Sequence, residues 1–458
     1  MKKSILLPLL SALIFTACNK NLDTVVDPPT KLTDTLPNAI VTDMTLDASK
    51  NYVINGQVYV KDGASLTIPA GTTVSVTKTD NLSEKGVLVI TQGSKLFVNG
   101  TSDKPVVFTS GAANKAPGDW GAVIILGKAP TNIATGNIPG LAVSASTAYG
   151  GAASDDNSGS IKYLRLEYCG GINPDGEDEW AVDKASGLVL ASVGSGTVVD
   201  NVMVAHSNDD GFQFVGGTVN ATHLIAYNNN DDDFDFDYGY EGRLQYIISY
   251  RTGLNSTHAL RANGFESYND EVPTLNAPLT RPIVSNMTII GPEGNLPTPG
   301  NINQGVYIRK GTRFVMQNSI IAEYTQGALM VCPKTRPVLL NNTGSLFRYN
   351  LVHSDTASRT FAFDHGMEMV SFADPQLEAF ALNATNNNQL FTASADLKLK
   401  TMYSSNGPDL TPADGSAALT GASFAGEDFS TFFTVVPYRG AIGGTSNWAA
   451  AGNWAVWK

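Results

Sequence analysis

A short internal repeat in the middle of this chain constrains its fold more than any other feature. Residues 208–214 read NDDGFQF and residues 230–236 read NDDDFDF, a shift of 22 residues. A looser third copy begins at residues 244–248 and resumes after a longer excursion at residues 263–266, which read NGFE. A fixed period in the twenties, with strand patterns and no helices, is typical of a β-solenoid whose coils stack about 4.8 Å apart.

Strand patterns extend over most of the chain. From about Ile40, apolar and polar residues alternate in short runs such as Val58-Tyr59-Val60, and Gly, Asn, Asp or Ser ends nearly every run. This is the period of a β-strand, and no amphipathic helical pattern extends beyond about two turns. The sequence predicts an all-β solenoid over residues 41–400, with residues 41–52 covering one end and residues 401–458 forming the last coils and a cap at the other.

The N-terminus predicts export. Lys2 and Lys3 precede an apolar run that is too short to span a bilayer, which is typical of a secretory signal peptide. The run ends in Phe-Thr-Ala-Cys18, which resembles the lipobox of bacterial lipoproteins. We therefore expect a signal peptide at residues 1–17, lipidation at Cys18, attachment to a membrane through that lipid, and a flexible tether over residues 18–40.

Charge and motifs exclude several classes of protein. The chain carries 42 Asp and Glu against 30 Lys and Arg, a formal net charge of −12, and phosphate binding depends mainly on Lys and Arg. No phosphate-cradling G-x-x-x-x-G-K-[ST] loop and no nucleophile elbow with a plausible order of Asp and His occur. We expect no nucleic-acid or nucleotide partner. Cys169 and Cys332 form either one disulfide or two buried small apolar residues, and their strand-like surroundings favour the second interpretation.

Eight short motifs along the chain match a known family. In chain order they are GASLTIPAGT at 63–72, GDWG at 118–121, LGKAP at 126–130, GSGT at 194–197, SNDDGF at 207–212, GGTVN at 216–220, NGFES at 263–267 and YRGA at 438–441. In these motifs the chain resembles Bacteroidetes-type exported lipoproteins of the pectate-lyase-like superfamily. The resemblance implies a right-handed parallel β-helix with terminal caps, anchored to the outer membrane and facing outward at the cell surface, with the periplasmic leaflet as the open alternative. Most members have no assigned activity, so it implies architecture far more than chemistry.

The acidic stretch after residue 230 is the main candidate site. In a strand, Phe234, Phe236 and Tyr238 share the face that packs beneath Phe212 and Phe214. Asp233, Asp235 and Asp237 then share the outer face. The repeat places Gln213 beside Asp235 on one side and Glu266 on the other, with Asp209, Asp210, Asp231 and Asp232 at the preceding turn.

Carboxylates this close repel one another unless they share a cation, and Ca²⁺ accepts many oxygen ligands in flexible geometry. The candidate Ca²⁺ ligands are Asp231, Asp232, Asp233, Asp235 and Asp237; the open alternative is that Asn and Asp only satisfy turn backbone groups. The spacing does not match an EF-hand. Zinc or iron is not expected, because no ligand spacing relates the histidines, which are His206, His223, His258, His353 and His365.

Three functions fit these features. The first is a surface protein that binds an extracellular glycan or another surface protein, with Tyr238, Tyr240 and Tyr307 as candidate sugar-stacking residues. The second is a purely structural spacer. The third is a polysaccharide-degrading enzyme, a lyase or a glycoside hydrolase.

The candidate catalytic residues of such an enzyme are Asp209, Asp210, Asp235, Glu266 and Arg309. Asp209-Asp210 and Ile308-Arg309-Lys310 resemble elements of polygalacturonases, although the Gly-His-Gly element is absent and the basic triplet is reordered. Catalysis requires the carboxylates to converge beside Arg309, whereas a binding surface needs only an open ridge. Three tryptophans near the C-terminus, Trp448, Trp454 and Trp457, are expected to cover the terminal coil rather than to bind sugar.

Overall fold

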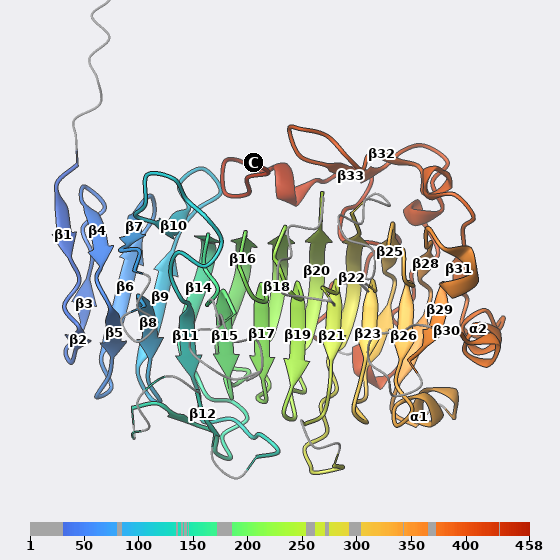
Figure 1. Ribbon diagram of the computed structural model, residues 1–458, viewed down its shortest axis with the longest axis horizontal. Helices are drawn as coiled ribbons and strands as arrows, with labels where there is room; N and C mark the ends of the chain where they lie inside the picture. Colours follow the sequence, from blue (N-terminus) through green and yellow to red (C-terminus); the bar gives the residue numbers. More distant parts are fainter. Residues whose placement is uncertain are drawn as a thin grey trace, which may run out of the picture. The chain divides into compact units, whose positions relative to one another are not determined.

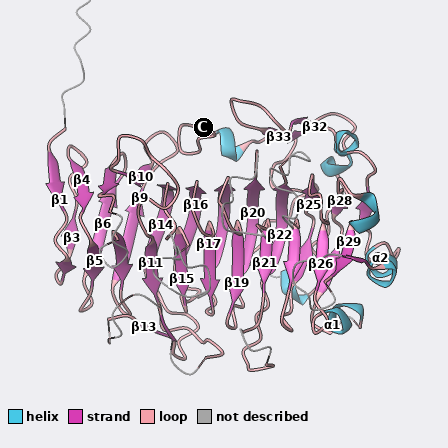
Figure 2. Cartoon of the chain, in the orientation of Figure 1, coloured by secondary structure: helices cyan, strands magenta, loops and turns pink. Residues whose placement is uncertain are grey.

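Parallel strands of adjacent coils make up most of the regular structure between Leu32 and Lys458 in the computed structural model (Figures 1 and 2). The structure describes residues 31–79, 85–133, 136–138, 141, 144, 146–171, 186–252, 262–270, 274–292, 304–341, 343–364, 372–429 and 431–458. The predicted signal peptide, Cys18 and the tether up to residue 30 lie outside them. No helix within these ranges is long and apolar enough to cross a membrane.

Two sheets form the walls of the solenoid. Within the described ranges the larger sheet, here sheet A, contains β1 (Thr33–Thr35), β3 (Met44–Thr45), β4 (Asn51–Ile54), β6 (Ser65–Pro69), β7 (Thr73–Val76), β9 (Lys95–Asn99), β10 (Val106–Ser110), β14 (Gly159–Glu167), β16 (Val198–Ala205), β18 (Asn220–Tyr227), β20 (Arg243–Tyr250), β22 (Ile283–Ile290), β24 (Val315–Gln317), β25 (Ile320–Ala322), β27 (Leu346–Arg348), β28 (Leu351–Val352) and β31 (Gln389–Leu390). Sheet B contains β2 (Ala39–Ile40), β5 (Gln57–Val60), β8 (Val87–Ile90), β11 (Val123–Leu126), β15 (Leu188–Ala191), β17 (Phe212–Val215), β19 (Phe234–Asp237), β21 (Phe265–Ser267), β23 (Val306–Ile308), β26 (Leu329–Val331), β29 (Phe361–Phe363) and β30 (Phe372–Ala373). The chain alternates between the two sheets, which confirms the all-β parallel β-helix.

The long strands of sheet A bend in the middle. One residue of each coil adopts a positive φ there, and in successive coils these residues are Tyr163, Asn201, His223, Tyr246, Asn286, Asn318 and Tyr349. The bend changes which residues point inward, because Val199 lies in the core before it and Val202 and Val204 lie in the core after it. The bend thus gives each coil a third face: the bend residue is left out of the pairing between coils, which resumes beyond it in the same register.

The interior is a continuous column of apolar side chains, including the predicted aromatic stacks. Phe212 stacks on Phe234 with ring centroids 4.9 Å apart, and Phe214 stacks on Phe236 at the same distance. Cys169 and Cys332 are both buried free thiols, so the interpretation as buried small residues holds and no disulfide joins them. Such stacks bury a core that a single coil cannot bury alone.

The ends of the solenoid differ from the prediction. Residues 41–52 are not a cap, because β3 and β4 pair with the next coil as ordinary strands, and the first strand already begins at Thr33. The last coils carry α1 (Arg336–Leu340) and α2 (Pro375–Ala381), and α2 lies at the far end of the stack (Figure 1). The remaining short elements within the described ranges are β12 (Gly136–Asn137), β13 (Ala148–Tyr149), β32 (Leu399–Thr401), β33 (Asp409–Pro412), η3 (Ala357–Arg359), η4 (Ser394–Leu397), η5 (Ala417–Leu419), η6 (Glu427–Phe429) and η7 (Trp448–Ala450).

The C-terminal segment also departs from the prediction. Instead of covering the terminal coil, it runs back along the outer face of sheet A toward β16 (Figure 1). Trp454 contacts Tyr163 on β14, Trp448 contacts His223 on β18, and Trp457 contacts Tyr250 on β20. The tryptophans are therefore packing residues, as expected, but they cover the side of the solenoid.

Replacing Trp448 with Ala is expected to lower the free energy of unfolding by roughly 2 kcal/mol, because this half-buried ring stacks on Trp454 and its Nε1 donates to the carbonyl of Ala441 at 2.8 Å. Urea unfolding of both proteins measures the difference. A loss below about 0.5 kcal/mol would show that the segment is not held by these contacts.

Candidate functional site

The candidate site lies on the outer face of sheet B. The register places Gln213 beside Asp235 and Asp235 beside Glu266, and the next coil adds Tyr307 to the same row. This is the order that the repeat predicts. We call Gln213, Asp235, Glu266 and the neighbouring Asp237 the acidic row.

The acidic row is buried, which the sequence did not predict. Asp235 and Glu266 are each 5% exposed and Asp237 is fully covered. Apolar residues of the loop before β14, including Ile138, Leu141 and Tyr149, pack on the outer face of sheet B, and Tyr149 lies close enough to Asp237 to interact with its charge. Outward-facing positions on this sheet are therefore not equivalent to solvent-exposed positions.

Two residues do not lie on the face of the strand that the sequence predicts: Asp233 was expected outside and Tyr238 inside. Asp233 points into the interior of the coil, where its carboxylate contacts Arg251 and accepts from Ser249 Oγ at 2.6 Å. Tyr238 has a positive φ and packs outside sheet B with Tyr268 instead of under Phe214. Both errors have one cause: residues 233 and 238 lie just beyond the ends of β19, where the strand alternation stops.

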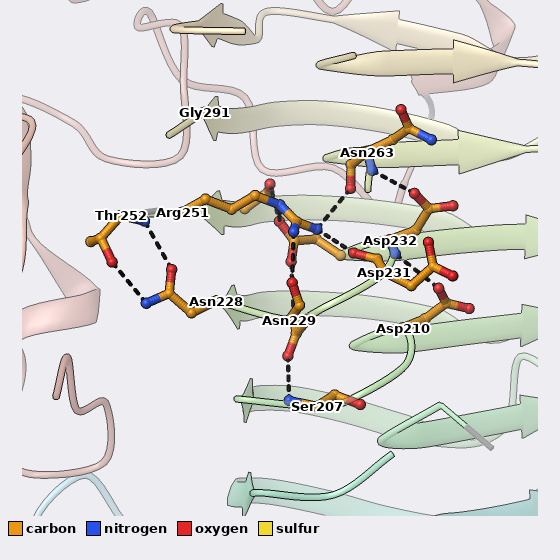
Figure 3. A network of polar contacts seen from close by, with 12 residues as sticks. Ser207, Asp210, Asn228, Asn229, Asp231, Asp232, Arg251, Thr252, Asn263 and Gly291 are labelled. Atoms are coloured by element: carbon orange, nitrogen blue, oxygen red, sulfur yellow. Dashed lines mark hydrogen bonds and ion pairs between the residues drawn. The ribbon is translucent and has the colours of Figure 1, made fainter. Parts of the chain in front are cut away.

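Arg251 is the main residue that the sequence did not identify. It is 1% exposed and lies inside the turn that leads from sheet A to sheet B (Figure 3). Its Nε donates to Asp233 Oδ2 at 3.1 Å, its Nη1 to the carbonyl of Asn229 at 2.6 Å, and its Nη2 to the carbonyls of Asp231 and Asn263. One guanidinium thus joins two consecutive coils, through the turn between β18 and β19 and the turn between β20 and β21. The alternation of side chains along a strand could have identified it, because Ser249 and Arg251 follow the inward-facing Ile247 at intervals of two residues.

The turn before sheet B carries a ladder of side chains. Asp210 Oδ1 accepts from the backbone N of Asp232 at 2.9 Å, and Asp232 Oδ1 accepts from the backbone N of Asn263 at 2.6 Å (Figure 3). Asn263 Oδ1 in turn accepts from the backbone N of Gln304 at 3.1 Å. One oxygen of each aspartate is therefore structural, as the alternative interpretation of the turn residues expected.

Arg309 lies next to the acidic row. Its Nη1 is 2.6 Å from Glu266 Oε1, and both side chains are buried. Glu266 Oε2 also accepts from Asn263 Nδ2 at 3.0 Å, so this carboxylate is held on both sides. Of the candidate catalytic residues, Asp210, Asp235 and Glu266 interact electrostatically and Arg309 pairs with Glu266, whereas Asp209 lies beside Asp210 and Asp231.

Hydrogen bonding within the row is incomplete. Asp237 Oδ2 accepts from Tyr268 Oη at 3.1 Å and from Gln213 Nε2 at 3.3 Å. Asp235 Oδ1 is buried and has no hydrogen-bond partner among the described residues. A buried carboxylate oxygen without a donor costs free energy, so it either carries a proton or faces a cation.

The electrostatics agree with this geometry. Burial raises the pKa of Asp235 well above its usual range, and the neighbouring Asp237, Asp210 and Glu266 raise it further. Burial and nearby carboxylates likewise raise the pKa of Asp210 and of Asp232. The native fold therefore disfavours the fully ionised cluster unless positive charge is added.

The turn also offers a set of oxygens that fits a metal ion. One carboxylate oxygen each of Asp209, Asp210 and Asp231 lies within 4.8 Å of the other two, and all three residues are half-exposed. Oxygen-only donors of this kind suit Ca²⁺. Of the predicted ligands, only Asp231 belongs to this set; Asp232, Asp235 and Asp237 lie outside it, and Asp233 is paired with Arg251.

The predicted sugar-stacking tyrosines are buried and do not offer a stacking surface, which makes that interpretation wrong for Tyr238, Tyr240 and Tyr307. A separate polar cavity of about 380 Å³ lies where sheet B leads back to sheet A. Its lining includes Thr218, Arg243 and Arg281, with the Arg281 guanidinium held by Asp428 at 2.8 Å through both terminal nitrogens.

Stacked parallel coils with a buried acidic row on one sheet define an elongated parallel β-helix protein. Residues 38–393 match the family described as pectate-lyase like beta helix domain. This match covers most of the chain, and the protein belongs to that family. The assignment fixes the fold, whereas the chemistry has to be argued from the site.

Two further comparisons add little. The crystal structure of the Dettilon tailspike protein is similar at 14% identity, over 63% of this chain and 59% of that chain, with a TM-score of 0.22. The match thus spans less than two thirds of the tailspike chain. No curated protein matches the sequence.

Proposed function

We propose that this protein is a cell-surface lipoprotein, anchored through Cys18, that binds an extracellular glycan at a Ca²⁺-dependent site beside the acidic row. The observation that carries the proposal is the buried Asp235 Oδ1, which has no hydrogen-bond partner among the described residues and lies among Asp237, Asp210 and Glu266. A divalent cation supplies the missing positive charge and leaves coordination positions for sugar hydroxyls or carboxylates.

The charge balance supports the same proposal. Asp210, Asp232, Asp235 and Glu266 interact electrostatically, and Arg309 is paired with Glu266. Asp209 and Asp231 add two half-exposed carboxylates at the rim. The rim is the part of the site that a bulky ligand reaches, while the buried row holds the ion in place.

The proposal is tested by electrophoresis through gels that contain neutral or acidic polysaccharides, with Ca²⁺ or with EDTA. Wild-type protein is expected to be retarded by a polysaccharide in Ca²⁺ and released in EDTA. Asp235→Asn should lose the Ca²⁺-dependent part, whereas Asp396→Asn, which changes an exposed carboxylate of η4, should behave as wild type. Equal mobility in every gel contradicts glycan binding and favours protein adhesion or a structural spacer.

Glycoside hydrolysis is a second candidate, and one observation favours it. Hydrolysis needs one carboxyl that keeps its proton near neutral pH and one that is ionised. Here the raised pKa of Asp235 and the ion pair of Glu266 with Arg309 place such a pair side by side. Staining the same gels for polysaccharide separates the candidates, because hydrolysis clears the polymer around the wild-type band and Asp235→Asn abolishes the clearing.

A further inference from the structure

A second cluster of ligating side chains lies outside the acidic row. Glu323 directly follows β25, and His353 and Asp355 follow β28 in the next coil. One oxygen of each carboxylate and one ring nitrogen of His353 lie within 4.8 Å of one another. The three residues belong to two successive turns that lead from sheet A to sheet B.

Glu323 is the unusual member of this cluster. The residue is only 7% exposed. Its backbone N donates to His353, but its carboxylate has no hydrogen bond or ion pair with the residues that the structure describes. The hydroxyl of Thr325, two residues further on, is also buried without a partner in the same ranges. No Lys or Arg of these ranges pairs with the Glu323 carboxylate, so it is available to ligate a cation.

His353 is oriented to act as a ligand. The backbone N of Glu323 donates to His353 Nδ1 over 3.3 Å, so the lone pair of Nδ1 faces Glu323. At 3.3 Å this hydrogen bond is longer than is usual for an N–H donor, and an ion bound at Nδ1 would replace it. Asp355 is exposed and can supply the third ligand of the ion from the solvent side.

We propose that Glu323, His353 and Asp355 bind a first-row divalent metal ion such as Zn²⁺, with water in the remaining position. Two carboxylates and one imidazole are a donor set that suits Zn²⁺, whose ligands lie at about 2.0–2.2 Å. The ligand atoms of the three residues lie within 4.8 Å of one another, so they can surround one ion. The imidazole distinguishes this site from the oxygen-only acidic row, which suits Ca²⁺.

Co²⁺ is the probe, because its visible absorption reports the geometry and the ligands of the ion directly. Metal-free full-length protein titrated with Co²⁺ is expected to bind one ion at this site and to develop visible bands that Zn²⁺ abolishes and excess Ca²⁺ does not. His353→Gln and Glu323→Gln should each weaken binding by on the order of 100-fold. Asp235→Asn is the matched control and should leave the spectrum unchanged.

Melting curves of the two variants in EDTA confirm that both remain folded, and Glu323→Gln is the milder change if His353→Gln does not fold. Absence of Co²⁺ and Zn²⁺ binding by the wild type in equilibrium dialysis overturns the proposal. Unaltered binding by the folded Glu323→Gln variant does so too, because the ion would then lie elsewhere. Loss of the bands in Asp235→Asn alone would assign them to the acidic row and overturn the proposal equally.

Discussion

Saturating Ca²⁺ is expected to stabilise this protein strongly at pH 7.5 and only weakly at pH 4.5. An ion that binds the native state alone adds about 2.7 kcal/mol to the free energy of unfolding at a concentration of 100 times its Kd. At low pH, protons compete for the same oxygens of Asp210, Asp232 and Asp235, because burial raises the pKa of each of these carboxyls. Differential scanning calorimetry at both pH values measures the effect.

The pH dependence without Ca²⁺ has a definite sign. A carboxyl whose pKa is higher in the native state than in the unfolded chain binds more protons when folded, in the pH range between the two values. The free energy of unfolding then falls as the pH rises from about 4 toward the raised pKa values. In EDTA the protein is therefore expected to melt at a lower temperature at pH 7.5 than at pH 5, and Ca²⁺ should remove most of this difference.

Asp235→Asn separates this explanation from others. Removing one buried negative charge should raise the stability in EDTA at pH 7.5 and, at the same time, reduce the gain from Ca²⁺. Asp396→Asn removes an exposed charge far from the row in sequence and should change neither quantity. A Ca²⁺ gain that is equal at both pH values, or that survives in Asp235→Asn, contradicts a site at the acidic row.

The repeat made the coil register predictable from the sequence. Once residues 208–214 are aligned with 230–236, the pairs Phe212–Phe234 and Gln213–Asp235 follow from a single shift, and both are observed. The family resemblance extended the solenoid toward both ends of the chain, and the family match bears this out for residues 38–393. A period fixes which residues are neighbours, because each coil repeats the path of the previous one.

Burial and turn geometry were not predictable in the same way. Alternation identifies an outer face, but the loop residues Ile138 and Leu141 that cover part of it are distant in sequence from the acidic row. At the turns, single residues with positive φ such as Tyr238 break the alternation. Glu323 and His353 come together across coils of a different length, so no spacing motif marks them. The direction of the C-terminal segment depends on contacts such as Trp454 with Tyr163, which no local pattern contains.

Replacing Arg251 with Met is expected to lower the free energy of unfolding by about 3–5 kcal/mol, the usual cost of leaving a buried charge without its partner. Met fills much of the volume of the arginine stem, so the loss comes from the guanidinium. Asp233 is fully buried and would keep only Ser249 and Asn229 as hydrogen-bond donors. The carbonyls of Asn229 and Asn263 would each lose a donor as well.

Urea unfolding of Arg251→Met beside Arg243→Met gives the comparison. Arg243 lies on the same strand, β20, but its guanidinium is half-exposed at the polar cavity, so its replacement should cost no more than about 0.5 kcal/mol. Adding Asp233→Leu to Arg251→Met removes the uncompensated charge and should restore part of the stability. Equal losses in the two arginine variants would mean that the interior ion pair contributes little.

The same variant links the interior to the site. Arg251 Nη2 donates to the carbonyls of Asp231 and Asn263, and these residues lie on the turns that carry the aspartate ladder. Loss of the guanidinium should loosen those turns and weaken Ca²⁺ binding by roughly 10-fold, although Arg251 itself does not contact the acidic row through any of these bonds. Isothermal calorimetry with Ca²⁺ under conditions where the variant is folded measures this. Unchanged Ca²⁺ affinity would show that the interior network supports only the fold. A weakened Ca²⁺ affinity would show that the buried guanidinium positions the carboxylates for the ion.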